Sequence, residues 1–296
     1  MNFNSDLAAI HAYLCADGYV TINPESRKIK YYKIGLRNKN LGLLTDFQNR
    51  FLKHFGVMPH LYPGERCELG SKKINTYLTN RFGSFYSYEW KMPENLNVGL
   101  KKIWIRTYFD CEGWVFCKRK QNRHLGADCV NEKALNQVKR ELESLGIKII
   151  KKVVKNGKMF RILIYGKENL MKFQSEINFN HPEKRLKLQE VVSDFVNYKW
   201  VIKENPQSIR ELMLEKAKIK KPYVTRIVSK EEENLIILKN YLNSLFGVDY
   251  IKINKRINGL GTIYFELSIN KRDEVKKLVK HNLINASELN KINWRE

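Results

Sequence analysis

Two acidic residues that each end an apolar, helix-length segment are the residues best able to do chemistry together. Asp17 ends the segment at residues 7–17, Glu112 ends the segment at residues 103–112, and each acid is followed by glycine. An acid at the C-terminal end of a helix opposes the helix dipole, so its occurrence at two matched positions argues against chance. Carboxylates that converge repel each other unless a cation neutralises them, and hard oxygen ligands suit Mg²⁺.

Small residues at helical spacing in both segments would let the two helices approach each other closely. Three alanines recur every four residues in the first segment, and a threonine and a cysteine have the same spacing in the second. These residues are Ala8, Ala12, Ala16, Thr107 and Cys111. If the two stripes face each other, the ends of the helices meet, and the two acids meet with them. A basic protein with two metal-bridging acids at a pseudo-twofold axis suggests hydrolysis of a phosphodiester.

The elements that must position the acids follow both segments in the same order. Two short alternating strands come first, and then a helix that ends at a glycine. A second hairpin turns at Pro63-Gly64 in the first copy and at Asn156-Gly157 in the second, and a last helix follows. The sequence therefore predicts an α+β fold with two pseudo-symmetric αββαββα repeats, at residues 1–98 and 99–198, plus a smaller C-terminal α/β portion.

The C-terminal portion, residues 199–296, has two interpretations. Residues 208–228 resemble a helix-turn-helix whose second helix would read DNA. Alternatively, a degenerate motif helix precedes a third αββα copy, whose first helix spans residues 233–246 and whose last begins near Arg272. Under the first interpretation the expected DNA contacts are Lys220, Lys221, Tyr223, Thr225 and Arg226.

The composition indicates the class of partner. Lys and Arg number 54 against 31 Asp and Glu, and a net charge of +23 attracts polyanions, of which nucleic acid is the first candidate. Apolar residues make up 43%, which excludes a wholly disordered chain. No run approaches the roughly 18 apolar residues of a membrane span, so no membrane partner is expected. Five cysteines without a C-x-x-C pair argue against a disulfide frame or a zinc site. A reducing compartment is therefore expected, either the cytoplasm or the organelle or nucleoid in which a DNA target lies.

Strand alternation predicts which side chains face a groove. In the first repeat Val20, Ile22, Ile34 and Leu36 should pack on the helices, and the opposite phase should face out. Exposed aromatic residues beside Lys and Arg suit a DNA surface, although charged hairpin tips are also commonly just solvated. The expected contacts are Tyr19, Thr21, Asn23, Arg27, Lys28, Lys30, Lys33, Arg37, Trp114, Phe116, Lys118, Lys120 and Arg123.

Residues 10–18 and 105–113 resemble the two nonapeptides of the LAGLIDADG homing endonucleases. The spacing resembles the single-chain, two-repeat members, and the resemblance covers roughly residues 5–197. It implies a monomer whose two saddle-shaped sheets straddle double-stranded DNA. It also implies that Asp17 and Glu112 bind Mg²⁺ at the scissile phosphates, aided by the backbone carbonyls of Ala16 and Cys111.

The resemblance further implies a basic catalytic residue where the helix after the second strand begins. Lys39 fits this place in the first repeat, where a solvated lysine is the alternative. The second repeat has Glu132 there, and Lys133 is only an offset substitute, so the chemistry at the two DNA strands need not be symmetric.

These features together predict a site-specific, Mg²⁺-dependent double-strand DNA endonuclease with a long asymmetric target. One alternative is a non-cleaving transcriptional regulator on the same fold, which would be expected to lose the two acids. The other is an intron maturase that binds RNA, and the sequence leaves it open.

Overall fold

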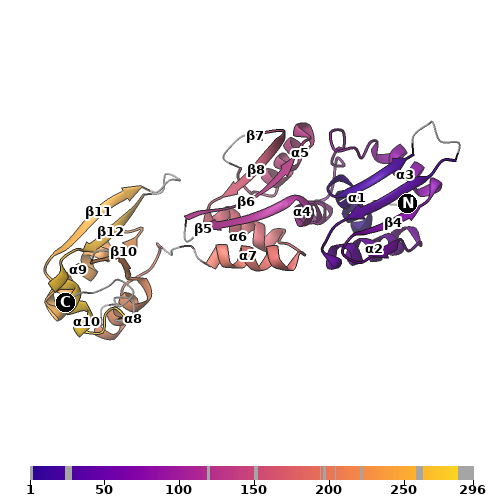
Figure 1. The fold of residues 1–296 in the computed structure, drawn as a ribbon. Helices are drawn as coiled ribbons and strands as arrows, with labels where there is room; N and C mark the ends of the chain where they lie inside the picture. The colour runs from indigo at the N-terminus through magenta and orange to yellow at the C-terminus, as the bar shows by residue number, and fades with distance from the viewer. Residues whose placement is uncertain are drawn as a thin grey trace. The chain divides into compact units, whose positions relative to one another are not determined.

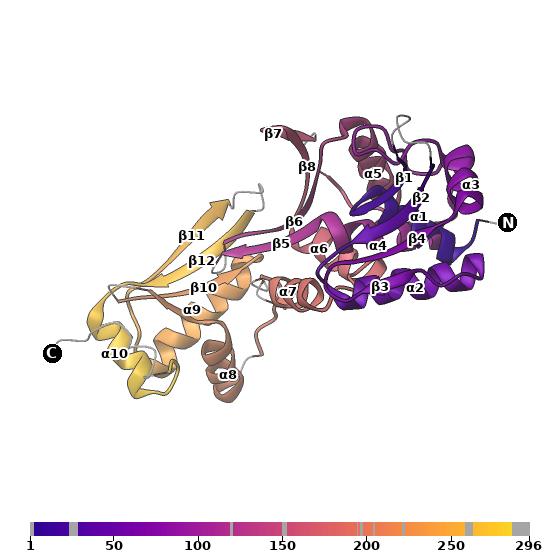
Figure 2. The ribbon, with the colours of Figure 1, turned by 45° about the vertical axis from the view of Figure 1, so that its right-hand side comes forward.

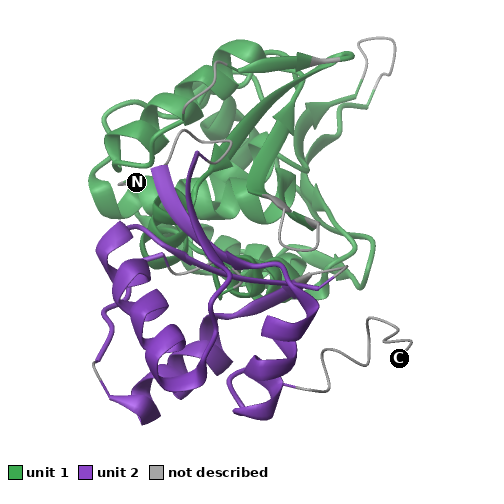
Figure 3. Ribbon diagram, turned by 90° about the vertical axis from the view of Figure 1, so that its left-hand side faces the viewer, with its two compact units in different colours: residues 1–195 green, residues 196–296 purple. Residues whose placement is uncertain are grey.

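The chain forms two compact units, residues 1–195 and 196–296 (Figure 3). The computed structural model describes residues 3–285 except 24–28, 119–120, 150–152, 194, 196–197, 204, 221–222 and 258–262. Each unit has a hydrophobic core of its own: one extends from Leu7 to Val191 and the other from Ile202 to Ile284. The two units are therefore described separately.

The first unit contains two successive copies of the same set of elements (Figure 1). The first copy consists of α1 (Ser5–Cys15), β1 (Gly18–Ile22), β2 (Tyr32–Arg37), α2 (Leu41–Phe55), β3 (His60–Tyr62), β4 (Arg66–Gly70) and α3 (Lys72–Phe82). The second consists of α4 (Val98–Glu112), β5 (Gly113–Lys118), β6 (Gln121–Cys129), α5 (Glu132–Ser144), β7 (Val154–Asn156), β8 (Met159–Tyr165) and α6 (Lys167–Glu176), and α7 (Pro182–Ser193) closes the unit.

Both copies build an antiparallel sheet with the same strand order. The order is β1-β2-β4-β3 in the first sheet and β5-β6-β8-β7 in the second. The predicted αββαββα repeat is confirmed in both copies. The hairpin turns lie where the sequence predicts them, because Gly64 and Gly157 adopt φ angles of 71° and 65°, a region that glycine enters without steric cost.

Matched asparagines start the middle helices of the two repeats. The side chain of Asn40 accepts a hydrogen bond from the amide of Leu43 at 3.2 Å, and that of Asn131 accepts one from Ala134 at 3.1 Å. Each cap satisfies an amide that the first helical turn leaves unpaired. Because each asparagine follows its second strand closely, the caps fix where α2 and α5 leave the sheets.

The helices α1 and α4 form the most extensive helix–helix contact of the first unit, and Figure 1 shows them side by side between its two sheets. Ala8, Ala12 and Thr107 are almost completely buried. The indole Nε1 of Trp104 donates to His11 Nδ1 at 3.0 Å and so joins the two helices. Burial lowers the pKa of His11 to about 3, so the imidazole stays neutral and can accept this bond.

We expect that enlarging the small side chains of this helix pair destabilises the protein. Ala12→Leu or Thr107→Leu adds volume where no exposed space exists, and such overpacking costs about 1–3 kcal/mol or more. Thermal denaturation measures the effect, and Thr76→Leu, at an exposed position of α3, is the matched control. Equal melting temperatures for the three variants would show that the helices are not closely packed at these positions.

The second unit is a complete third copy of the repeat. It consists of α8 (Pro206–Lys216), β9 (Lys218–Lys220), β10 (Val224–Ser229), α9 (Glu232–Phe246), β11 (Ile251–Ile257), β12 (Ile263–Ile269) and α10 (Arg272–Lys280). The sheet order β11-β12-β10-β9 is the order of the other two sheets read from the opposite edge. The third-copy interpretation is therefore correct, and the copy is larger than the sequence alone indicated.

The helix-turn-helix prediction for residues 208–228 is wrong. Residues 224–229 form a strand that pairs with β12 on one side and β9 on the other. Their burial alternates with a period of two, and four of the six residues are β-branched, which suits a pleated sheet better than a helix. Thr225 is fully buried, so it cannot contact DNA as predicted.

Two further expectations concern the membrane and the cysteines. Within the described residues, no helix has the length and apolar character needed to cross a membrane. All five cysteines are free thiols.

Candidate active site

The two acids lie at the ends of the paired helices and interact with each other. Glu112 is the last residue of α4, and Asp17 lies between the end of α1 and the start of β1. Burial raises the pKa of Glu112 to about 7, and the charge of Asp17 contributes to the increase. Asp17 is also hydrogen-bonded to the thiol of Cys111, whose pKa is raised by burial and by that carboxylate. The helix pair thus brings residues 95 positions apart into one site.

The first repeat fixes Asp17 from the end of β2. The side-chain amide of Asn38 donates to Asp17 Oδ2 at 2.8 Å, and the backbone amide of Arg37 donates to the Asp17 carbonyl at 3.1 Å. In the second repeat the position that corresponds to Asn38 is Cys129, whose Sγ accepts a hydrogen bond from the amide of Asn131 at 3.3 Å. The surroundings of the two acids are therefore not equivalent.

A lysine that sequence reasoning missed supplies positive charge beside both acids. Lys184 Nζ, on α7, donates to the carbonyl oxygens of Asp110 at 2.6 Å and Cys111 at 3.0 Å, at the C-terminal end of α4. Burial lowers the pKa of Lys184, and the nearby carboxylates and thiol oppose that shift. The lysine in turn acts to lower the pKa of Glu112. The sequence held one hint of this lysine: Lys184 stands two residues after Pro182, with which the closing helix α7 begins.

Asp110 holds α7, and with it Lys184, against the end of α4. Its Oδ1 accepts hydrogen bonds from the amides of Asn180 at 2.8 Å and His181 at 3.0 Å, just before α7 begins. Asn40 Nδ2 lies 3.2 Å from His181 Nε2, so the first repeat contacts the same turn. Burial raises the pKa of Asp110 to about 7, although the two amides favour its charged form.

Lys39 does not contact the acids in this structure. Its side chain is exposed, and it forms no ion pair within the described part of the chain, whereas its neighbour Asn38 reaches Asp17. A catalytic role for Lys39 stays a prediction.

The site fits a divalent cation of the Mg²⁺ type. Among the described residues no group of three or more His, Cys, Asp or Glu side chains could hold a metal ion. Mg²⁺ does not need one, because it commonly keeps several waters and takes its protein ligands from one or two carboxylates, with substrate phosphates completing the shell. Burial, and then the charge of Asp17, raise the pKa of Glu112 to about 7, so a cation bound there would favour its charged form. The Cys111 carbonyl, a predicted metal ligand, already accepts from Lys184; it and Ala16 stay predicted ligands.

The outer face of the first sheet is polar and charged. Tyr19 Oη donates to Glu68 Oε2 at 2.8 Å, and the Arg37 guanidinium lies 5.3 Å from the centre of the Tyr19 ring. Lys33 is exposed and lies 3.9 Å from Glu68. Tyr19, Lys33 and Arg37 thus lie on the outer face of the sheet, as the alternation along the strands predicted. Ile22 differs: it is 49% exposed, at the last pair of the β1–β2 ladder, so it does not pack on the helices as predicted.

The outer face of the second sheet is aromatic. The His124 ring contacts three aromatic rings, and its centre lies 4.9–5.2 Å from the ring centres of Trp114, Phe116 and Tyr165. Arg161 donates to both carboxylate oxygens of Asp128 at 2.6 Å and lies 5.0 Å from the centre of a Trp114 ring. Sequence reasoning found Trp114 and Phe116 but missed the partners, which come from β6 and β8.

A glycine on each second strand makes room for the aromatic residue that begins each sheet. A Cβ atom at Gly35 would lie 2.5 Å from the hydroxyl of Tyr19, and one at Gly126 would lie 2.7 Å from the ring of Trp114. The two positions correspond, so in both repeats an aromatic ring that directly follows the acid-glycine pair packs against the glycine of β2 or β6.

The structure says less about the remaining residues that were predicted to contact DNA. Asn23 closes its own hairpin, donating to the Ile29 carbonyl and accepting from the Tyr31 amide, both at 2.7 Å. Thr21 is half-buried and Lys30 exposed, while Arg123 lies over the Phe195 ring. Arg27, Lys28, Lys120 and Lys221 lie outside the described residues, and the side chains of Lys118 and Lys220 do as well.

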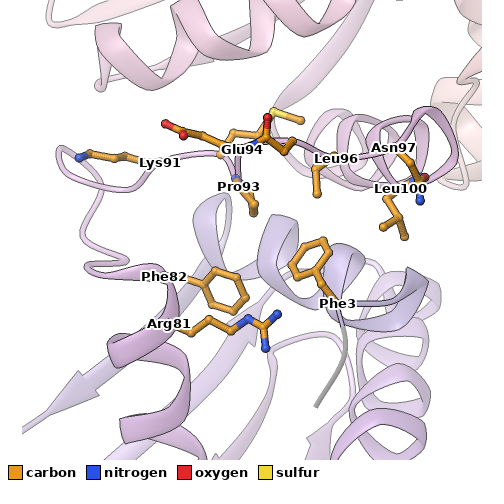
Figure 4. A pocket seen from close by; sticks show the side chains of 11 residues that line it. Phe3, Arg81, Phe82, Lys91, Pro93, Glu94, Leu96, Asn97 and Leu100 are labelled. Carbon is orange, nitrogen blue, oxygen red and sulfur yellow. The ribbon is translucent and has the colours of Figure 1, made fainter.

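A cavity in the first unit lies apart from the acids. It has a volume of about 500 Å³ and is formed by residues before α1, at the end of α3 and along residues 91–100 (Figure 4). Its walls include Phe3, Arg81 and Leu96, and neither Asp17 nor Glu112 lines it.

Known proteins resemble this chain in sequence and in fold. The family model of the LAGLIDADG-like domain matches residues 100–178. No curated protein matches the sequence. Among solved structures, the homing endonuclease I-DmoI in complex with DNA and Mn is 19% identical, covers 59% of this chain and 97% of its own, and has a TM-score of 0.43.

Two other solved structures are similar at lower identity. The homing endonuclease I-WcaI bound to its DNA recognition sequence is 13% identical, covers 62% of this chain and 85% of its own, and has a TM-score of 0.41. The N-terminal LAGLIDADG domain of WhiA is 11% identical, covers 60% of this chain and 86% of its own, and has a TM-score of 0.40. The LAGLIDADG-like match at residues 100–178 includes the second acid-glycine segment, and it agrees with the family resemblance predicted from the two segments.

Proposed function

We propose that this protein is a divalent-metal-dependent endonuclease that cleaves both strands of DNA at a long, asymmetric target. The observation that carries the proposal is the convergence of Asp17 and Glu112 at the ends of one close helix pair, between two sheets of a strongly basic chain. The LAGLIDADG-like domain at residues 100–178 supports the same function. The regulator alternative has no role for two carboxylates held together in this way.

The proposal gives each residue of the site a separate role. Asp17 and Glu112 would hold the metal, for which we propose Mg²⁺; a bound divalent ion supplies Lewis acidity at a phosphoryl oxygen. Asn38 orients the Asp17 carboxylate. Lys184 neutralises part of the negative charge at the end of α4 and keeps Glu112 easier to ionise. Lys39 would position a water molecule from the first repeat only.

An asymmetric target follows from the different outer faces of the two sheets. The first presents Arg37, Lys33 and hydrogen-bonded Tyr19, whereas the second presents Trp114, Phe116 and His124. Side chains with different donors, acceptors and apolar surfaces read different base edges in the major groove. The two halves of the target should therefore differ in sequence although the two repeats share one topology.

A cleavage assay on a library of randomised duplex DNA tests the proposed function. The wild-type chain is incubated with Mg²⁺, with Mn²⁺ or with a chelator, and the cut ends are sequenced. We expect cleavage at a restricted set of sites that needs the metal. Tight DNA binding without any cleavage would favour a regulator, and preferential binding of structured RNA would favour a maturase; either result contradicts the proposal.

Metal binding should depend on pH through Glu112. Because its pKa is raised to about 7, Glu112 holds a proton below that pH and must lose it before binding a cation. Affinity for Mn²⁺ should therefore rise with pH through about 7 and then level off. Calorimetric titration in buffers of different ionisation enthalpy, about one unit below and one unit above that pH, should show proton release only at the lower pH. Glu112→Gln should bind more weakly and release no proton; an unchanged proton release in this variant would contradict the assignment.

A further inference from the structure

The third repeat separates its charges between its helices and its sheet. Strands β9 to β12 contain six Lys or Arg residues and one acid, Glu266. Helices α8, α9 and α10 contain seven Lys or Arg residues and six acids. The helices lie on one face of the sheet (Figure 2), so the sheet carries the larger share of the basic excess of this unit. A polyanion would be attracted to the sheet rather than to the nearly neutral helical layer.

Basic side chains form a row across the outer face of this sheet. Cross-strand pairing places Lys252 of β11 opposite Ser268 of β12, Ser268 opposite Arg226 of β10, and Arg226 opposite Lys218 of β9. Neighbouring strands lie about 4.8 Å apart, so the row spans roughly 14 Å, close to the ~12 Å width of a DNA major groove. Its basic residues are half-buried or exposed, as a phosphate-binding row requires.

The β11–β12 hairpin extends this face beyond the helices. Ile257 and Ile263 form the last described pair of the ladder and are 67% and 46% exposed. Arg256 is half exposed and lies 3.3 Å from Glu266, which also lies 3.5 Å from Arg226. The single acid of the sheet thus lies between two arginines, and both guanidinium groups keep exposed area. A two-stranded ribbon of this kind is one of the elements that a major groove admits.

The third repeat has no acid-glycine pair at the end of its first helix, whereas the first two repeats do. Lys216, Ala217 and Lys218 stand where the other copies have an acid followed by glycine. Glu215, the last acid before the strand, is exposed and paired with Lys216. Among the described residues, this end of α8 offers a cation no carboxylate pair, so the third repeat lacks the two acids on which the proposed cleavage depends.

We propose that the outer face of the β9–β12 sheet is a non-cleaving third DNA-binding surface that contacts duplex DNA through Lys252, Arg226 and Arg256. The choice of duplex DNA as the polyanion rests on the proposed function of the first unit. The surface differs from the predicted helix-turn-helix, because the contacts come from one face of a sheet and exclude the buried Thr225. It adds phosphate contacts, and therefore affinity, beyond those of the first two sheets.

The test compares charge removal from the sheet with the same removal from the helices, in the full-length chain. The sheet variant is Lys252→Ala with Arg256→Ala. The matched control is Lys276→Ala with Lys280→Ala, two exposed lysines on α10. Binding of a random-sequence duplex is measured over a range of salt concentrations, and melting curves establish that both variants are folded. A third variant, Lys252→Arg with Arg256→Lys, keeps the charge.

We expect the sheet variant to bind duplex DNA roughly tenfold more weakly or worse at ~0.1 M salt. The slope of log K against log salt should fall by about 1.8, which is 0.9 for each of two lost phosphate contacts. The helix control and the charge-preserving variant should keep the wild-type slope. Equal losses in the sheet and helix variants, or no loss in either, would overturn the proposal. Binding of a random-sequence RNA duplex is measured in parallel, and a loss of affinity for that RNA without a loss for DNA would also overturn the proposal, because it would assign the face to RNA.

The outcome is independent of cleavage. All variants keep Asp17 and Glu112, and only binding is measured. A wild-type chain that fails to cut DNA would contradict the proposed function and leave this comparison intact. A chain that cuts DNA but shows no difference between sheet and helix variants would contradict only the third binding surface.

Discussion

Replacing Asp17 by Asn, or Glu112 by Gln, should lower the rate of DNA cleavage by roughly a thousandfold or more. A metal ion contributes several kcal/mol of transition-state stabilisation, and each 1.4 kcal/mol corresponds to about tenfold in rate. Each substitution removes one charged ligand and keeps the shape of the side chain, so the α1–α4 pair should remain folded. Binding of duplex DNA should persist, because the basic surfaces of the sheets are unchanged.

The measurement is single-turnover cleavage of a selected target together with the affinity of each variant for it. Glu190→Gln, at an exposed acid of α7, is the matched control and should cut at the wild-type rate. If Asp17→Asn or Glu112→Gln also cuts at that rate, the two acids do not hold the catalytic metal. A parallel loss of DNA affinity and of the thermal transition would show instead that the variants are misfolded.

Lys184→Met should reduce cleavage by roughly a hundredfold and shift its pH dependence upward. The loss of a preorganised charged donor has effects of this order. Without the ammonium, Glu112 loses the group that lowers its pKa, so it ionises only at higher pH and binds the metal less readily. The carbonyls at the end of α4 also lose a donor, which should cost about 1–3 kcal/mol of folding free energy.

The pH–rate profile separates this role from a merely structural one. Part of the lost activity of Lys184→Met should return at higher pH or higher metal concentration, and Lys184→Arg should retain more activity than Lys184→Met. Lys187→Met, an exposed lysine of the same helix, should behave as the wild type. An unchanged pH profile in an active Lys184→Met variant would remove Lys184 from the site.

The fold of the first unit was largely predictable because its determinants are local. Asn40 and Asn131 cap their helices, and Gly64 and Gly157 turn the hairpins at positive φ. These signals act within a few residues of one another, so reading along the chain finds them twice at matched places. The third copy was only half recognised because its first strands carry no such signals and its acid-glycine pair is missing.

The error at residues 220–228 shows where local reading fails. Pro222 followed by a mixed polar and apolar stretch is compatible with the first turn of a helix and equally with a strand. Pairing decided the outcome, since β12 and β9 supply backbone partners on both sides of Thr225 and Arg226. Those partners lie up to about forty residues away, so no local pattern indicates them.

The sequence by itself determined the two acids, their pseudo-symmetric places and the basic character of the chain. Composition, helical spacing and repeated motifs are properties of the chain before it folds. Only the tertiary structure decided what surrounds the acids. Lys184 reaches the carbonyls at the end of α4 because Asp110 anchors the turn before α7, and Asn38 reaches Asp17 because β2 ends beside β1. The pKa of Glu112 depends on burial and on charges brought together by long-range contacts, and a linear sequence does not contain those distances.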